Sequence, residues 1–164
     1  MGTAFYMSIN IRNIKENDLV AVLELMRSFA EYEDLAKYCT VTTERLHRAM
    51  FGEEGFVEGF IAFDDEAPIA YALFHPNFSS FRGEMGLYLE DIYVLAEYRR
   101  HQIGLQLLRK IASIAKQRGL ERIDFLVLDW NTPAVNFYLK HGAEQNDGES
   151  HFKFAGDAFE LLTA

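Results

Sequence analysis

One near-continuous apolar run constrains the fold of this chain more than any other feature. The run IDFLVL occupies residues 123–128, and such a strand is typical of a sheet interior that is covered on both faces. It follows an amphipathic helical pattern that ends well at Arg118-Gly119, with a cation in the last turn and a glycine just beyond. The apolar face of that helix is Ile103, Leu107, Ile111, Ile114 and Ala115. A helix leading into a buried strand predicts an α/β fold.

The other elements follow from the same two periodicities. We expect strands at 9–11, 56–63, 69–74, 85–94 and 123–128, with one or two more at 151–154 and 159–162. We expect helices after Asn17-Asp18, around 44–50 with Thr42 or Thr43 as the cap, over 103–115, and from Asn131 to about Lys140. The predicted order is β-α-α-β-β-β-α-β-α-β in a single domain that spans residues 1–164.

Composition excludes several classes of function. The formal charge of −9 argues against a nucleic-acid binder, which needs a basic surface. No apolar run approaches the roughly 20 residues of a membrane span, so no membrane association is expected. A single cysteine, Cys39, permits no disulfide within the chain and suits the cytoplasm. Met7 resembles a second start, so we expect residues 1–6 to be an added or disordered segment.

The junction between strand 85–94 and the helix after it carries unusual charge. Glu90 and Asp91 lie within the strand, and Arg99-Arg100-His101 leads into the helix. A helix N-terminus offers free N–H groups and binds anions, although the glycine pattern of a P-loop is absent. Strand alternation places Glu90 and Asp91 on opposite faces, so we expect no paired metal site there.

The segment EYRRHQIG (97–104) resembles the acetyl-CoA pyrophosphate motif R/Q-x-x-G-x-G/A of the GNAT N-acetyltransferases. Arg99 stands at its first position, Gly104 at its last, and Gln102 replaces its first glycine. Together LYLEDIYV, FLVLDWNTPAVNFYLKHGA and FAEYEDL resemble the spermidine/spermine branch, which includes thialysine and other diamine acetyltransferases. The resemblance implies a mixed sheet of six to seven strands with about four helices, acetyl-CoA as cofactor, and a homodimer.

The resemblance also implies which residues contact the cofactor. A side chain at Gln102 has to point away from the phosphates. Asn131 is similar to a residue that contacts pantetheine, although capping the helix explains it equally well. Backbone N–H groups near Tyr93 and Val94 are placed to stabilise the thioester oxygen. The alternative for Val94 is that it is an ordinary core residue. The implied cofactor residues are Ile92, Tyr93, Val94, Arg99, Arg100, His101, Gln102, Ile103, Gly104, Asn131 and Phe137.

Two residues are implied to catalyse the reaction. An alkyl amine has a pKa of about 10.4 and attacks a thioester only when neutral, so a base has to take its proton. Glu90 matches the family's base, and a bulge that the family usually has in this strand alters the alternation. Tyr138 matches the family's general acid, which protonates the departing thiolate. The alternative for Glu90 is an ordinary ion-paired acid, and the alternative for Tyr138 is one more aromatic side chain beside Phe137.

Three residues are implied to bind the substrate. Glu33 is similar to an acid that holds the far end of a polyamine, and it continues the apolar stripe of helix 19–30; the alternative is that the helix frays there. Tyr32 is adjacent, and Asp91 resembles a residue near the substrate amine. The family's tryptophan in an E-G-W stretch is absent, because Gly148-Glu149-Ser150-His151 stands in its place.

The sequence therefore predicts an N-acetyltransferase that acts on a primary amine of a small cationic substrate: a polyamine, a diamine, or an amino acid such as thialysine or lysine. One alternative is a protein lysine or N-terminal acetyltransferase, which needs an open groove. Another is a non-catalytic CoA-binding domain, which Gln102 favours and the presence of Glu90 with Tyr138 opposes.

Overall fold

A computed structural model describes residues 7–146, 148 and 150–162. The expectation for residues 1–6 lies outside this range. The chain forms two compact units, one ending at Leu126 and one beginning at Val127. Within the described range, no helix is long and apolar enough to cross a membrane.

A five-stranded sheet in the order β1-β2-β3-β4-β5 forms the centre of the first unit. Neighbours from β1 to β4 pair antiparallel, whereas β4 and β5 pair parallel and are connected through α3. A parallel pair needs such a crossover, which confirms the helix expected between them. The strands are β1 Ile9–Asn13, β2 Glu58–Asp64, β3 Ala67–Ser79, β4 Glu84–Val94 and β5 Ile123–Asp124.

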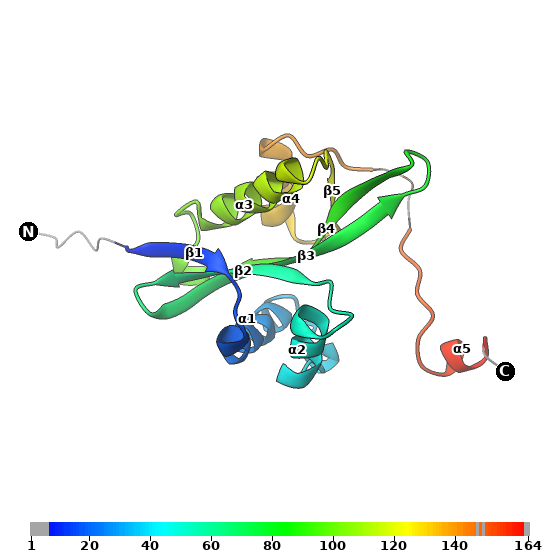
Figure 1. Cartoon of the computed structure of the whole chain (residues 1–164), viewed down its shortest axis with the longest axis horizontal. Coiled ribbons are helices and arrows are strands. Elements are labelled where there is room, and N and C mark those ends of the chain that lie inside the picture. Colours follow the sequence, from blue (N-terminus) through cyan, green and yellow to red (C-terminus); the bar gives the residue numbers. More distant parts are fainter. Residues whose placement is uncertain (1–6, 147, 149, 163–164) are drawn as a thin grey trace, which may run out of the picture. The chain divides into compact units, whose positions relative to one another are not determined.

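Helices cover both faces of this sheet (Figure 1). The helices α1 (Leu19–Tyr32) and α2 (Thr43–Phe51) lie on one face and α3 (Ile103–Gln117) lies on the other. Short 3-10 helices at Glu16–Asp18, Ala36–Tyr38 and Ala96–Tyr98 connect them. Thr42 caps α2 by accepting the N–H of Arg45. On the α1–α2 face the core contains Ile14, Leu19, Val22, Leu25, Leu46, Ile61, Tyr71, Leu73 and Tyr93.

The second unit contains α4 (Thr132–Lys140) and the short α5 (Asp157–Glu160). Asn131 caps α4 as expected, since its side-chain oxygen accepts the N–H of Ala134 at 3.3 Å. Pro133 lies in the first turn, where its missing N–H removes no helical hydrogen bond. Sequence-based boundaries of this helix are therefore confirmed.

The α/β class is confirmed, but the expected six to seven strands are five in the described part of the chain. The strand expected at 123–128 ends at Asp124, because only Leu87↔Ile123 and Tyr88↔Asp124 pair with β4. Leu126 is 66% exposed, so this run is not covered on both faces. Strands expected at 151–154 and 159–162 are wrong: the first segment is exposed and irregular, and α5 overlaps the second after the left-handed Gly156.

The strand β3 is longer than the sequence indicates, because it continues through Pro76 to Ser79. Proline ordinarily interrupts a central strand, since it donates no ladder hydrogen bond. The first residue of β2, Glu58, pairs with Phe74, and β2 does not extend beyond this pair. Beyond that point β3 has only β4 as a neighbour, so Pro76 lies on an edge and its missing N–H is tolerated.

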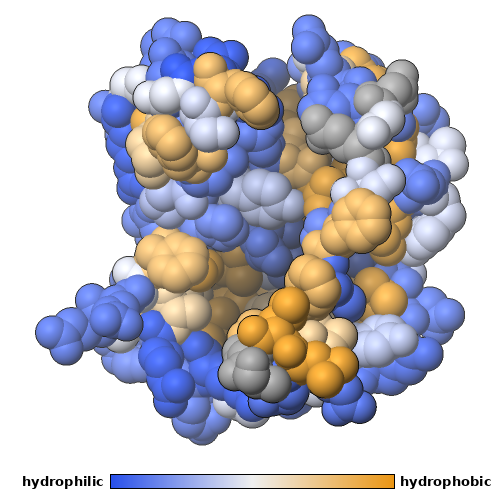
Figure 2. Space-filling view, turned by 90° about the vertical axis from the view of Figure 1, so that its right-hand side faces the viewer, coloured by the Kyte–Doolittle hydropathy of each residue, from blue (hydrophilic) through white to orange (hydrophobic). Residues whose placement is uncertain are grey.

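Aromatic and aliphatic side chains are not confined to the core. On the face drawn in Figure 2, apolar patches interrupt a largely hydrophilic surface. Among the exposed apolar residues are Phe78, Phe81 and Met85, around the turn between β3 and β4, and Leu126 at the end of the first unit. The aromatic side chains, which make up 14% of the chain, therefore lie on the surface as well as in the core.

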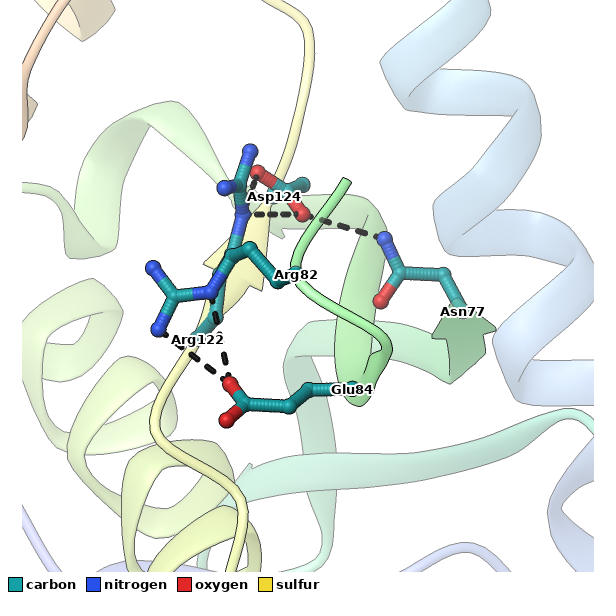
Figure 3. Close-up of polar contacts among 5 residues, drawn as sticks. All are labelled: Asn77, Arg82, Glu84, Arg122 and Asp124. Atoms are coloured by element: carbon teal, nitrogen blue, oxygen red, sulfur yellow. Dashed lines mark hydrogen bonds and ion pairs between the residues drawn. The ribbon is translucent and has the colours of Figure 1, made fainter. Parts of the chain in front are cut away.

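A polar cluster fixes the start of β5 beside β4 (Figure 3). Asp124 accepts hydrogen bonds from Arg122 at 2.7 Å and from Asn77 of β3 at 3.1 Å. Gly86 of β4 lies between them, and a Cβ there would approach the Asn77 side-chain oxygen to 2.8 Å. The cluster therefore links β3 with β5 across a glycine, immediately before the point where β4 and β5 stop pairing.

Candidate active site

A β-bulge in β4 determines how the two acids face. Leu73 pairs with Asp91 and Phe74 pairs with Leu89, so Glu90 is an extra residue with no partner in the register. A bulge shifts the side-chain alternation of its strand. Directly paired residues share a face, so Asp91 lies on the α1–α2 face with Leu73.

Glu90 lies on that face as well, two residues beyond Tyr88, the partner of His75. Its carboxylate lies 3.4 Å from Nε2 of His75. His75 is two residues beyond Leu73 on β3 and therefore shares its face, and its ring contacts Phe56, which follows α2. The expectation that Glu90 and Asp91 lie on opposite faces is wrong, because alternation holds only where the strand is regular.

Asp91 is held by a buried tyrosine. The Tyr71 hydroxyl donates to Oδ2 of Asp91 at 2.9 Å, and Tyr71 itself is fully buried. Burial raises the pKa of Asp91 to about 6 against the opposing effect of this hydrogen bond, and the charges of Glu90 and Glu33 raise it further. Asp91 therefore titrates near neutral pH, as is common for functional carboxylates.

Glu33 and Tyr32 lie at the end of α1, beside this acidic site. The helix ends at Tyr32, and Glu33 is its half-buried C-cap residue. Burial raises the pKa of Glu33, and its charge acts on both Asp91 and Tyr71. Tyr93 stacks on Phe29 at 5.2 Å and lies 6.3 Å from the Tyr32 ring. The first unit thus brings Glu33 and Asp91 close to a group of aromatic rings, and the charge of Glu90 also acts on Asp91.

Arg99 contacts both the end of β4 and two of these aromatic rings. Its Nε donates to the carbonyl of Val94 at 3.0 Å, and its guanidinium lies 4.4 Å above the Tyr32 ring and 5.7 Å from the Tyr93 ring. Part of the side chain expected to meet phosphate is thus engaged with α1 and β4. Its cation–π contacts help to fix the loop that follows.

The loop before α3 has the geometry of an anion-binding nest. Arg100 and Gln102 both adopt left-handed backbone conformations, with φ of 67° and 60°. Successive N–H groups in such turns converge on an anion. The first-turn N–H groups of α3, which include those of Ile103 and Gly104, have no intrahelical acceptors, and Gln102 makes no capping hydrogen bond to them. These residues fit a phosphate-bearing cofactor.

His101 and Arg100 complete the loop as exposed basic residues. Ile103 is buried, with 1% exposure, so only its backbone is available to a cofactor. Ile92, Tyr93 and Val94 lie on β4 beyond Tyr88, where the described residues provide no further pairing with β5. This edge of β4 is therefore open to an extended ligand, although the carbonyl of Val94 already accepts a hydrogen bond from Arg99.

Gln102→Gly is expected to tighten CoA binding a few-fold and to stabilise the fold. A non-glycine residue in the left-handed region costs about 1 kcal/mol, which glycine does not pay. Calorimetric titration with CoA and thermal melts check this. Asp65→Gly is the matched control, because Asp65 also has positive φ (51°) in a distant turn. We expect that control to stabilise the fold without changing CoA affinity, and equal CoA affinity in both variants contradicts the prediction.

The remaining predicted residues belong to the second unit. Tyr138 is buried, with 8% exposure, and burial raises its pKa above the ordinary value of 10. The Phe137 ring meets the Tyr138 ring edge-on at 5.2 Å and the His141 ring at 5.0 Å. Asn131 is buried and caps α4. Tyr138 therefore carries a hydroxyl that stays protonated at neutral pH.

Comparison with known families agrees with this arrangement. The family described as "Acetyltransferase (GNAT) family" matches residues 19–143. The chain belongs to the GNAT acetyltransferase family. It is an enzyme that transfers an acetyl group from acetyl-CoA, with a mixed sheet flanked by helices as the resemblance implied.

Relatives of known activity extend over nearly the whole chain. The thialysine N-epsilon-acetyltransferase of Bos taurus is 34% identical over 165 residues, which cover 94% of this chain and 96% of that protein. The L-ornithine N5-acetyltransferase of Arabidopsis thaliana is 35% identical over 99 residues, which cover 60% of this chain and 43% of that protein. The branch expected from the sequence is therefore confirmed.

Solved structures show the same fold. An integron cassette protein from the mobile metagenome of V. cholerae has a TM-score of 0.80 at 22% identity, covering 96% of this chain and 99% of that one. An aminoglycoside N-acetyltransferase in complex with CoA has a TM-score of 0.73 at 16% identity, covering 92% and 97%. At these identities the likeness concerns the fold alone.

Sequence reasoning missed Tyr71 and His75. Both lie on β3, on the face of Leu73, opposite the acids of β4. Their signal is a period of two, since positions 71, 73 and 75 alternate toward one face. This alternation is visible in the sequence, but the register that aligns positions 71–75 with Glu90 and Asp91 depends on the bulge.

Proposed function

We propose that the acetyl acceptor is a primary amine of a small cationic molecule, in the class of thialysine, ornithine, diamines and polyamines. The observation that carries the proposal is the proximity of three carboxylates in the first unit, since the charges of Glu90 and Glu33 both act on Asp91. Partly buried carboxylates beside tyrosine rings suit an alkylammonium group, which gains from both charge pairing and cation–π contact. The names of the relatives support the same class.

We assign the two acids of the bulge different roles. Asp91, held by Tyr71, binds the substrate ammonium and orients its nitrogen. Glu90 is about half exposed and accepts the proton that the nitrogen loses before it attacks. A proton acceptor needs access to water for turnover, whereas a binding group gains from burial, and the two carboxylates differ in that sense.

The cofactor-binding role falls to the loop and the helix that follow β4. Bound acetyl-CoA supplies the thioester that the amine attacks. The N–H groups at the start of α3 and the basic side chains of Arg100 and His101 are assigned to its phosphates. The open edge of β4 at Ile92–Val94 is assigned to its extended arm. In the second unit, Tyr138 is assigned to donate its hydroxyl proton toward the departing sulfur, and Asn131 and Phe137 to line the arm.

Release of CoA thiol tests the proposal. Acetyl-CoA is mixed with thialysine, ornithine, lysine, putrescine, spermidine, spermine or a lysine peptide, and free thiol is followed with a colorimetric reagent. Turnover with at least one free amine, at least tenfold above the peptide, is expected. Turnover with the peptide alone contradicts the small-molecule assignment and favours a protein acetyltransferase.

Glu33→Gln is expected to discriminate between dications and monocations. A charge-assisted hydrogen bond contributes about 1.5–3 kcal/mol, so KM for a diamine rises by about tenfold or more. KM for a monoamine of equal length changes little, because it has no second ammonium. Glu31→Gln is the control, since Glu31 is an exposed acid on the same helix. Equal changes for the two amines contradict the role of Glu33.

We also propose a cytoplasmic homodimer. The branch that the chain resembles is typically dimeric, and exposed apolar side chains such as Leu126 and Phe78 supply surface for an interface. The single cysteine suits a reducing compartment. Light scattering is expected to give about twice the chain mass of 18.9 kDa, and a monomer at micromolar concentration contradicts the proposal.

A further inference from the structure

We propose that His75 is a positioning residue that shares the transferred proton with Glu90. The inference rests on the proposed role of Glu90 as the proton acceptor, and it assigns a function to a side chain of β3 that the site described above does not use. Four observations carry it: two atomic contacts, the surrounding rings, and the bulge.

The first contact fixes the tautomer of His75. Its Nδ1 lies 3.0 Å from the carbonyl oxygen of Pro76. A carbonyl oxygen only accepts, so Nδ1 carries a hydrogen atom. In the neutral ring the lone pair therefore lies on Nε2. Backbone carbonyls commonly set the tautomer of functional histidines in this way.

The second contact places that lone pair against a carboxylate. Nε2 of His75 lies 3.4 Å from Oε2 of Glu90. Neither an anionic carboxylate nor a lone pair donates, so the contact is attractive only when one proton lies on one of the two atoms. The pair is therefore a site for a single proton that the two groups share.

The surroundings keep the ring in this position. His75 stacks on Tyr88 at 5.3 Å and meets Phe56 edge-on at 5.6 Å, and 24% of its side chain remains exposed. The titratable groups that face the pair are Tyr88 and Asp91, both on β4, and the pKa of Tyr88 is raised by burial and by the charge of Glu90. The ring is thus oriented by aromatic contacts yet remains open to water.

The bulge places both acids on the face of His75. His75 pairs with Tyr88, so regular alternation already brings Glu90 to this face, and the extra residue brings Asp91 to it as well. Asp91 is meanwhile engaged by Tyr71. The two acids therefore contact two different residues of β3. Tyr71 keeps Asp91 in place for the ammonium, and His75 contacts Glu90.

The proton balance is simple. The N–H bond of the substrate ammonium breaks and an O–H bond forms on Glu90. That proton is shared with Nε2 of His75, where an imidazolium is neutralised by the Glu90 carboxylate, and it then passes to water. No oxidant, metal or further reactant is needed.

Three variants of His75 test the proposal with the amine that turns over best. His75→Phe keeps the ring contacts with Tyr88 and Phe56 but has no nitrogen. We expect kcat to fall about 10- to 100-fold, less than the roughly 10²- to 10⁴-fold typical of a direct acid–base group, because Glu90 still accepts the proton. His75→Gln keeps polarity without a base, and a similar loss is expected. His75→Ala is expected to recover at least fivefold when imidazole is added, whereas His75→Phe recovers nothing.

A second histidine provides the control. Nε2 of His47 lies 3.4 Å from Oε2 of Glu16, the same distance as in the proposed pair, and its ring contacts Phe51. His47→Phe is expected to leave kcat unchanged. Glu90→Gln is measured in parallel, because a loss there with wild-type kcat in His75→Phe overturns the role of His75 alone. If the wild type itself releases no thiol with any amine, the proposed function fails instead.

Thermal melts and CoA titrations of every variant separate folding from chemistry. His75→Phe is expected to melt within a few degrees of the wild type and to bind CoA equally well. A purely structural role predicts the reverse result: Phe restores activity by filling the ring position, and imidazole has no effect on His75→Ala. Either of those two outcomes overturns the proposal.

Discussion

Tyr138→Phe is expected to lower kcat by about 10²- to 10³-fold, within the range of general acid catalysis. The KM for acetyl-CoA should change less than threefold, because the ring and its contact with Phe137 remain. Burial raises the pKa of Tyr138 above 10, so the hydroxyl is protonated throughout the usual assay range. Initial rates of thiol release and CoA titrations measure the two parameters separately.

Tyr38→Phe is the matched control for this change. Tyr38 is 66% exposed at the end of a short 3-10 helix of the first unit, and its hydroxyl has no assigned role. We expect wild-type kcat in that variant. A kcat within threefold of the wild type in Tyr138→Phe contradicts the role of Tyr138 as the proton donor and leaves the thiolate to be protonated by water.

Asp91→Asn is expected to lower kcat/KM for the amine by about 100-fold, mainly through KM, because the loss of a partner for a buried charge costs about 3 kcal/mol. In the wild type, an acid whose pKa is raised to about 6 is anionic above that pH and neutral below it. Ammonium binding needs the anion, so KM should rise as the pH falls through about 6. Asp91→Asn should lose this pH dependence.

Tyr71→Phe provides a finer test of the same group. The Tyr71 hydrogen bond lowers the pKa of Asp91, while burial and the neighbouring acids raise it. Without the hydroxyl the pKa of Asp91 rises further, so the increase in KM should begin at a higher pH, while KM at pH 8 stays near the wild-type value. Unchanged pH dependence of KM in both Tyr71→Phe and Asp91→Asn contradicts the assignment. Thermal melts exclude unfolding as the cause.

Separate kinetic parameters distinguish the two acids of the bulge. The Asp91 variants are expected to act on KM for the amine, whereas Glu90→Gln and the His75 variants act on kcat. This division follows from the structure, since Tyr71 holds one carboxylate and His75 contacts the other. Effects of all these variants on KM alone contradict the assignment of Glu90 and His75 to proton transfer.

Local patterns predicted most of the helices well. Thr42 and Asn131 cap α2 and α4 through their own side chains, and Gly119 follows α3 with positive φ. Such signals depend on residues within one turn of each other, so a single sequence carries them completely. The helix after Asn17-Asp18 was also expected, although Asp18 pairs with Arg12 at 2.6 Å and does not cap α1 through its side chain.

Strand predictions failed where the existence of a strand depends on pairing with a neighbouring strand. The run 123–128 is apolar enough for a strand, yet it pairs with β4 over only two residues. The tail was expected to contain strands, but residues 157–160 form α5. A strand exists only where a neighbour completes its hydrogen bonds, and the neighbour is distant in sequence. Pro76 shows the converse. It is tolerated within β3 because it lies beyond the pair Glu58↔Phe74, where β3 no longer pairs with β2.

The sequence by itself determined the α/β class and the family, and it supplied the residues to which we assign the chemistry, because motifs and periodicities are local. Only the tertiary structure decided which side chains meet. A single extra residue in β4 brings Asp91 to the same face as Glu90, so that Asp91 meets Tyr71 while Glu90 meets His75. A bulge is a mismatch between two strands, so its effect on the site depends on the register of β3 against β4 and cannot be read from either strand alone.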